Sequence, residues 1–133
     1  MDERRGTAGG AEIVGVDVSG RHAEAGEYLM VGAAVHALVG PNRLRSVEGM
    51  GFATSAEEPT LSAVADVVGG AIGELPEEPG GPVVAEHGEF YEEPDWSVAQ
   101  HLERDFKYIE SIAERQTVQA AHHAAYGARN LLL

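Results

Sequence analysis

The sequence contains no cysteine among its 133 residues. A disulfide framework and a zinc site built on thiolates are therefore both excluded. No apolar run reaches the ~18–20 residues that a membrane-spanning helix needs, and residues 1–10 lack the apolar stretch of a signal peptide. We therefore expect a cytoplasmic protein with no membrane partner, in which residues 1–10 form a flexible tail and residues 11–133 form one domain.

Lysine is nearly absent, since Lys107 is the only one beside eight arginines. Asp and Glu together number 22, and the formal net charge is −13. Such an acid excess with scarce lysine is typical of salt-adapted organisms, in which high salt screens the repulsion between like charges. An acidic surface ordinarily argues against nucleic-acid binding. In a halophile every surface is acidic, so nucleic acid stays a candidate partner.

Three strands are expected in the first half of the chain. Residues 12–18 are largely apolar, as in a strand covered on both faces, and residues 28–39 form a second apolar run that ends in a Gly-Pro-Asn turn. The polar loop 19–27 suggests that these two strands form a hairpin. The alternation of polar and apolar residues over 43–47 predicts a half-exposed edge strand.

The second half of the chain changes to helical spacing. Thr60 can cap a helix whose apolar stripe runs from Leu61 to Leu75. Residues 83–85 form a short apolar strand. A further helix is expected to start at Pro94-Asp95, with Asp95 as its cap and Trp96 on its apolar face.

The last part of the chain ends in the clearest helix, over residues 117–132, whose apolar stripe is mostly alanine. Residues 105–116 fit either a short strand or a helix, and we favour a strand. The resulting order is three strands, a helix, a strand, a helix, a strand and a helix. It predicts an α/β domain with a mixed sheet, in which three antiparallel strands precede helix-connected strands and the helices pack on the sheet.

Glu12 stands at the start of the first strand, and Asp17 is the one acidic side chain within the apolar run 13–18. A lone carboxylate there is costly to bury unless a cation meets it. A right-handed crossover would place the strand at 83–85 beside the first strand, so that Asp17 and Glu86 lie near the same end of the sheet. We therefore predict a metal site with Asp17 as a ligand, completed by Glu86 and the pair His122-His123.

Three stretches resemble the RuvC type of Holliday-junction resolvases, and the element order resembles the ribonuclease H-like fold. Residues 13–20 are similar to the first strand of that family, in which an Asp follows a Gly-apolar pair. Residues 83–90 are similar to its fourth strand, which ends in a metal-binding Glu. Residues 119–126 are similar to its last helix, which presents His or Asp ligands among alanines. The whole chain also resembles an uncharacterised family of haloarchaeal proteins.

The resemblance implies a ribonuclease H-like domain that acts as a metal-dependent phosphodiesterase or nuclease on DNA or RNA. It implies Asp17, Glu86, His122 and His123 as candidate catalytic residues, with Asp17, Glu86 and His123 as metal ligands. Adjacent helical residues point about 100° apart, so only one of the two histidines can face the site. Carboxylate oxygens suit Mg²⁺ or Mn²⁺, and a histidine ligand favours Mn²⁺.

Part of the pattern also fits a non-catalytic protein. Ala124 and Ala125 stand where the resolvases usually carry a second acidic residue, which favours an interaction module that keeps the fold and has lost part of the metal site. A nearby acid could supply the metal ligand in place of Glu86, namely Glu89, Glu92 or Glu93. These three glutamates could equally form solvated acidic surface.

Three further features stay open at this level. The turn after Asp17 also resembles the phosphate turn of sugar kinases and actin-like ATPases, but those proteins need a second domain to close over a nucleotide. Arg21 and His22 could contact phosphate from this loop, although surface polar residues in a turn are the simpler interpretation. Residues 131–133 are three leucines that offer an apolar patch to a neighbour, so a homodimer is retained as a candidate assembly.

Overall fold

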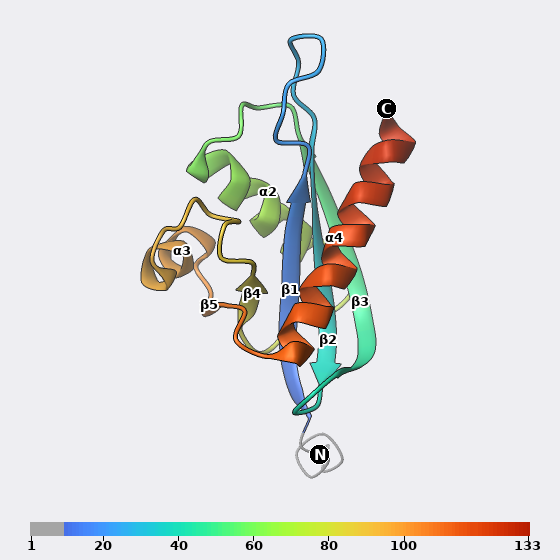
Figure 1. Cartoon of the computed structure of the whole chain (residues 1–133), viewed down its shortest axis with the longest axis vertical. Coiled ribbons are helices and arrows are strands. Elements are labelled where there is room, and N and C mark those ends of the chain that lie inside the picture. The colour runs from blue at the N-terminus through green and yellow to red at the C-terminus, as the bar shows by residue number, and fades with distance from the viewer. Residues whose placement is uncertain (1–9) are drawn as a thin grey trace.

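A computed structural model describes residues 10–133 as a five-stranded mixed sheet with helices packed on it (Figure 1). Apart from Gly10, the tail expected over residues 1–10 lies outside the described residues. The elements in chain order are β1 (Ala11–Ser19), β2 (Met30–Val39), β3 (Leu44–Ser55), α2 (Leu61–Gly73), β4 (Val83–Ala85), α3 (Asp95–Leu102), β5 (Phe106–Tyr108) and α4 (Ile112–Leu132).

The strand order in the sheet is β3-β2-β1-β4-β5. The first three strands pair antiparallel, whereas β4 pairs parallel to β1 and β5 pairs parallel to β4. The chain thus leaves the edge strand β3, crosses through α2 and returns beside β1, as the sequence predicted. The α/β class, the mixed sheet and the neighbouring positions of β1 and β4 are confirmed.

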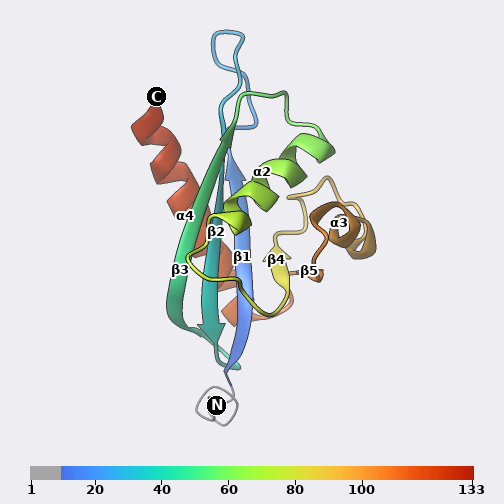
Figure 2. The ribbon, with the colours of Figure 1, turned by 180° about the vertical axis from the view of Figure 1, so that it is seen from behind.

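Two helices cover opposite faces of the sheet. Figure 1 shows α4 in front of β1 and β2, and Figure 2 shows α2 on the opposite face. The α2 face holds the larger core, in which Val14, Val16 and Val18 of β1 pack against Val64 and Val68 of α2. The N-terminus of α2 is capped as predicted, because the Thr60 hydroxyl accepts a hydrogen bond from the Ala63 N–H. None of the described helices has the length and hydropathy of a membrane span.

Helix α4 lies very close to the sheet. A side-chain carbon at Gly15 of β1 would come within 2.9 Å of the Thr117 backbone, so only glycine permits this approach. Alanines 121 and 125 of α4 pack on Ala33 and Val35 of β2 in the same way, with small side chains on both sides. The alanine-rich stripe read from the sequence is therefore the surface that brings α4 onto β1 and β2.

The start of α4 was predicted too late in the chain. It begins at Ile112 rather than at residue 117, because Ser111 and Glu114 form a capping box. The Ser111 hydroxyl accepts from the Glu114 N–H at 3.1 Å, and the Glu114 carboxylate accepts from the Ser111 N–H at 3.1 Å. The ambiguous stretch 105–116 thus divides into the predicted short strand, β5, and the first turn of α4.

Replacing Ser111 by alanine is expected to destabilise the protein by about 1 kcal/mol, because the first turn of α4 loses a hydrogen-bond acceptor. The free energy of unfolding can be measured by urea denaturation. Ser62→Ala provides a matched control, since Ser62 is exposed within α2. Equal effects of the two substitutions would show that the cap contributes nothing.

Two local predictions were wrong. Asp95 is the first residue of α3 rather than its cap: Pro94 precedes it, and no side chain caps this helix. Trp96 is 64% exposed, because the short α3 buries only Val98 and Leu102. The predicted edge strand is confirmed as β3, and it continues beyond the alternating residues 43–47 to Ser55.

Candidate carboxylate and histidine site

Asp17 lies near the end of β1, on the face of the sheet that α4 covers. Side chains alternate along β1, so that Val16 and Val18 enter the core beneath α2 while Asp17 points to the other face. Only 10% of the Asp17 side chain is exposed. The carboxylate therefore belongs to a covered sheet surface, as the sequence predicted, and not to a solvated loop.

Glu86 directly follows β4. The parallel register pairs Gly15 with Val84, and two further steps along both strands bring Glu86 beside Asp17. The negative charge of Glu86 contributes to raising the pKa of Asp17, which indicates that the two carboxylates lie close together. The predicted juxtaposition on neighbouring strands is therefore present.

Helix α4 adds His122 to these carboxylates. Its Nδ1 lies 3.2 Å from Oδ2 of Asp17, and Asp17, Glu86 and His122 line one cavity of about 310 Å³ together with Val118 and Gln119. His123 does not line this cavity, and its ring centroid lies 5.5 Å from that of His122. The structure thus brings three of the four predicted residues together, and the metal role of His123 stays a prediction.

Glu89 is a buried carboxylate beside Asp17. Its Oε2 accepts a hydrogen bond from the Val18 N–H at 2.8 Å and another from Nη2 of Arg21 at 2.6 Å. The same Nη2 donates to the Glu89 carbonyl oxygen at 2.7 Å, and the guanidinium lies 5.3 Å from the centre of the Tyr91 ring. Arg21 and Glu89 therefore tie the turn after β1 to the loop after β4.

The buried acids have raised pKa values. Burial raises the pKa of Asp17 from 3.8 to about 6, and the Glu86 charge adds to this, while a hydrogen bond from Glu89 and the charge of Arg21 oppose it. Burial and the Asp17 charge raise the pKa of Glu89 from 4.5 to about 7, against the opposing effects of Arg21 and the Val18 N–H. The site thus concentrates negative charge that Arg21 only partly balances.

The donor set suits a hard divalent cation, because Asp17 and Glu86 offer carboxylate oxygens and His122 offers a ring nitrogen. The burial and mutual repulsion of the acids also favour a bound positive charge. Over residues 10–133, however, no three such side chains form a preformed metal cluster. Glu86 faces a cation in Arg115, whose Nη1 lies 3.7 Å from Glu86 Oε2.

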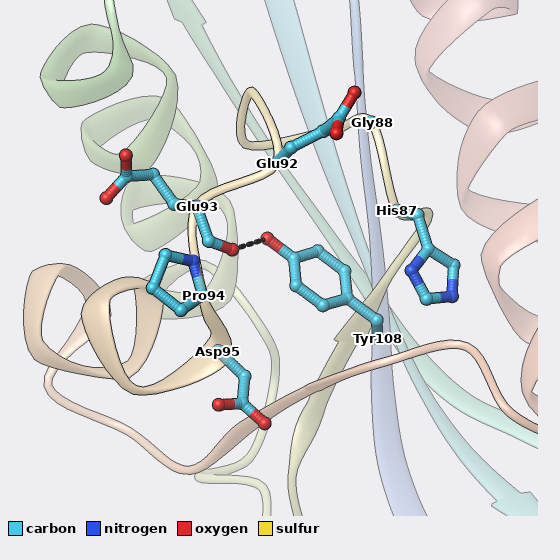
Figure 3. A pocket seen from close by; sticks show the side chains of 7 residues that line it. All are labelled: His87, Gly88, Glu92, Glu93, Pro94, Asp95 and Tyr108. Atoms are coloured by element: carbon cyan, nitrogen blue, oxygen red, sulfur yellow. Dashed lines mark hydrogen bonds between the residues drawn. The ribbon is translucent and has the colours of Figure 1, made fainter.

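A second cavity, of about 450 Å³, lies between the loop after β4 and β5 (Figure 3). The Tyr108 hydroxyl donates to the Glu93 carbonyl oxygen there, and the Tyr108 ring stacks on His87 with the centroids 5.1 Å apart. Burial and the charges of Glu93, Asp95 and Glu92 raise the pKa of Tyr108. Asp17, Glu86, His122 and His123 do not line this cavity, although the alternative ligands Glu92 and Glu93 do. Its acidic wall would repel a phosphate group.

The sequence left the roles of Glu89 and Arg21 open, and it gave no prediction for a third feature outside the Asp17 cavity. Glu89 was one of several alternative ligands, and Arg21 had no assigned partner. The third is a pair in which Nε2 of the buried His36 lies 2.6 Å from Oε2 of Glu12. The sequence signal for this pair was an acid in the first strand, Glu12, and a histidine in the second strand, His36. The register between the two strands was needed to show that these side chains meet.

The site and the sheet define a mixed α/β domain with a carboxylate and histidine cavity over β1, β4 and α4. Residues 14–133 match the family described as "Uncharacterized protein conserved in archaea (DUF2209)", and the chain belongs to this family. The match supports the expected archaeal family and covers all of the candidate site. No curated protein and no solved structure matches the chain.

Proposed function

We propose that this protein is a metal-dependent phosphodiesterase of the ribonuclease H-like superfamily, acting on DNA or RNA. One observation carries the proposal: Asp17, Glu86 and His122, which are remote along the chain, line one cavity. The antiparallel β1, β2 and β3, followed by the parallel β4 and β5, agree with the arrangement that the resemblance implies. Support therefore comes from the topology and from the side chains that this topology brings together.

The proposed metal ligands are Asp17 and Glu86, with His122 as a ligand or a base. When bound there, Mg²⁺ or Mn²⁺ would neutralise charge on the phosphate and lower the pKa of a water molecule. Such a cation would also balance the repulsion between the buried acids. We propose Arg21 and Glu89 as positioning residues, because their contacts hold the turn that follows Asp17.

His122 has the geometry of a general base. With its proton on Nδ1, the ring donates to Asp17 and leaves Nε2 as an acceptor. The side chain is 57% exposed, so water reaches the ring. In hydrolysis, a water oxygen would bond to phosphorus, one water proton would pass to His122, and the leaving sugar oxygen would take a proton from solvent as its bond to phosphorus breaks.

Cleavage of branched DNA and of an RNA–DNA hybrid should be assayed in molar KCl, with and without Mn²⁺. We expect Mn²⁺-dependent cleavage that Glu86→Gln reduces by about 100-fold or more, because a ligand carboxylate is lost. Glu92→Gln is the matched control, since this exposed glutamate follows the same strand but does not line the Asp17 cavity. Equal activity of both variants, or no cleavage by the wild type, would reject the nuclease proposal.

The second candidate is a non-catalytic interaction module with the same fold. This candidate is favoured because each acid already has a partner within the protein. Asp17 pairs with His122, Glu86 with Arg115 and Glu89 with Arg21. The two candidates differ in metal binding. The interaction module predicts no change in melting temperature with Mn²⁺, whereas the phosphodiesterase predicts a rise that is lost in Glu86→Gln.

A further inference from the structure

Strand β3 is an edge of the sheet, with only β2 as its partner in the part of the chain that the structure describes. The register is regular from Gly49–His36 to Ser55–Met30, without a bulge. Residues 49–55 carry no charge, in a chain with 23% charged residues. Soluble proteins usually protect such edges with charges, proline or bulges, so this half of β3 is an unprotected pairing edge.

The exposed face of this edge is apolar. Phe52 and Met50 lie opposite Ala33 and Val35 of β2, and residues directly opposite each other point to the same face. They therefore lie on the α4 side of the sheet, where they remain 40% and 41% exposed. The opposite face of β3 is closed, because a side-chain carbon at Gly51 would lie 2.2 Å from the Ala71 carbonyl oxygen of α2.

Charges flank the uncharged run with opposite signs. Arg43 and Arg45 precede it, Glu57 and Glu58 follow it, and all four are exposed. Glu48 stands between the arginines and the run, at the register irregularity between Val47 and Gly49, and its carboxylate accepts a hydrogen bond from the Ser46 hydroxyl. Each other Arg or Lys in residues 10–133 has a carboxylate partner: Arg21 with Glu89, Arg104 with Glu78, Lys107 with Glu110 and Glu114, Arg115 with Glu86 and Arg129 with Glu24. Within these residues, Arg43 and Arg45 alone make no ion pair, despite the large acid excess.

We propose that residues 49–55 of β3 pair antiparallel with the same residues of a second copy of this chain, joining two sheets into one. A two-fold axis at Gly51 places Met50 opposite Phe52 of the partner subunit. It also brings Arg45 toward Glu57 of the partner subunit, and the reciprocal pair follows by symmetry. The apolar residues meet in the middle, and opposite charges meet at both ends.

The charges favour a second copy of this chain as the partner that pairs with β3. Two chains of net charge −13 repel one another over most of their surfaces, and residues 49–55 form an edge where the contact itself is uncharged. Antiparallel pairing of identical strands places the basic end of each opposite the acidic end of the other. An unrelated partner would have to supply both features independently. This proposal does not depend on the phosphodiesterase activity.

The full chain should be studied by sedimentation equilibrium at micromolar concentration in molar KCl. We expect a dimer whose dissociation constant rises by ~100-fold in Phe52→Lys, because a lysine on the pairing edge opposes strand addition. Trp96→Lys is the control, since this exposed aromatic residue lies on α3 and not on the pairing edge. Circular dichroism and the melting temperature of the monomer check that each variant folds.

Two further measurements identify the interface. Arg45→Glu should raise the dissociation constant by about 10-fold, and the double variant Arg45→Glu/Glu57→Arg should restore it. Amide hydrogen exchange in residues 49–55 should slow as the protein concentration rises. A monomer at all concentrations would overturn the proposal. A dimer that Phe52→Lys leaves intact and Leu132→Lys dissociates would also overturn it, by placing the contact at the end of α4.

Discussion

Replacing Asp17 by asparagine is expected to stabilise the fold at about pH 8 by about 2 kcal/mol while abolishing the proposed metal-dependent cleavage. Asparagine has nearly the shape of aspartate but carries no charge. The buried carboxylate is costly to keep ionised, so its removal favours the folded state. The same carboxylate is the central ligand of the proposed site, so its removal eliminates the function.

The direction of this change in stability follows from the pKa of Asp17, which is about 6 in the folded protein against an ordinary value of 3.8. Below about pH 4 the acid is protonated in both states, and wild type and variant should be similarly stable. As the pH rises from about 4 to about 6, the wild type loses stability because burial disfavours the charged form, and above this range the difference stays constant. The difference corresponds to roughly 3 kcal/mol, at about 1.4 kcal/mol for each tenfold change in proton affinity. Loss of the contacts with His122 and Glu89 reduces the expected gain.

Urea unfolding of both proteins in a chelator, at about pH 4 and about pH 8, measures this difference. Asp66→Asn serves as a control because Asp66 is exposed on α2, and it should change stability by less than about 0.5 kcal/mol. Adding Mn²⁺ should raise the melting temperature of the wild type and not that of Asp17→Asn. A variant that is less stable than the wild type at about pH 8 would show that the carboxylate is a structural anchor.

The pairing of Asp17 with Glu86 could be predicted because it depends on strand order alone. An apolar strand, a helix and a second short strand imply a parallel neighbour once the crossover is right-handed. The register then fixes which residues lie side by side. The sequence narrowed the site histidine to His122 or His123. The choice between them needed the rotation of α4 about its axis, which Gly15 and the alanines of the helix determine.

Other features depend on tertiary contacts that leave no periodic signal. The loop after β4 curls back so that Glu89 reaches Arg21, and Tyr91 and Glu92 adopt left-handed backbone conformations there, with φ of 57° and 60°. The end of β3 could not be placed from the sequence, because Gly49 and Gly51 are poor strand formers. They are present because Pro76 and the backbone of α2 lie too close for any side chain.

Arg21→Ala is expected to cost about 3 kcal/mol of stability at about pH 8, because it leaves a buried carboxylate without its cation. Glu89 Oε2 would keep only the Val18 N–H as a donor. The side chains of Arg21 and Glu89 are 21% and 8% exposed, so water replaces the lost contact poorly. The free energy of unfolding is again the quantity to measure.

The effect should depend on pH in a defined direction. The pKa of Glu89 is about 7 with Arg21 present, and it rises further when that charge is removed. At about pH 5 the acid is then protonated and needs no cation, so the loss should fall below about 1 kcal/mol. Arg21→Ala should therefore be nearly as stable as the wild type in mild acid and clearly less stable above neutrality.

Arg104→Ala is the matched control, because the carboxylate that it pairs with, Glu78, is 78% exposed, whereas Glu89 is 8% exposed. It should cost less than about 0.5 kcal/mol at either pH. The double variant Arg21→Ala/Glu89→Gln should recover most of the loss at about pH 8, since the unpaired charge is removed along with its partner. If Arg21→Ala matches Arg104→Ala at both pH values, Arg21 does not balance the buried acids. The charge that holds Asp17 and Glu89 together must then come from elsewhere, and a bound cation in the Asp17 cavity is the arrangement that would supply it.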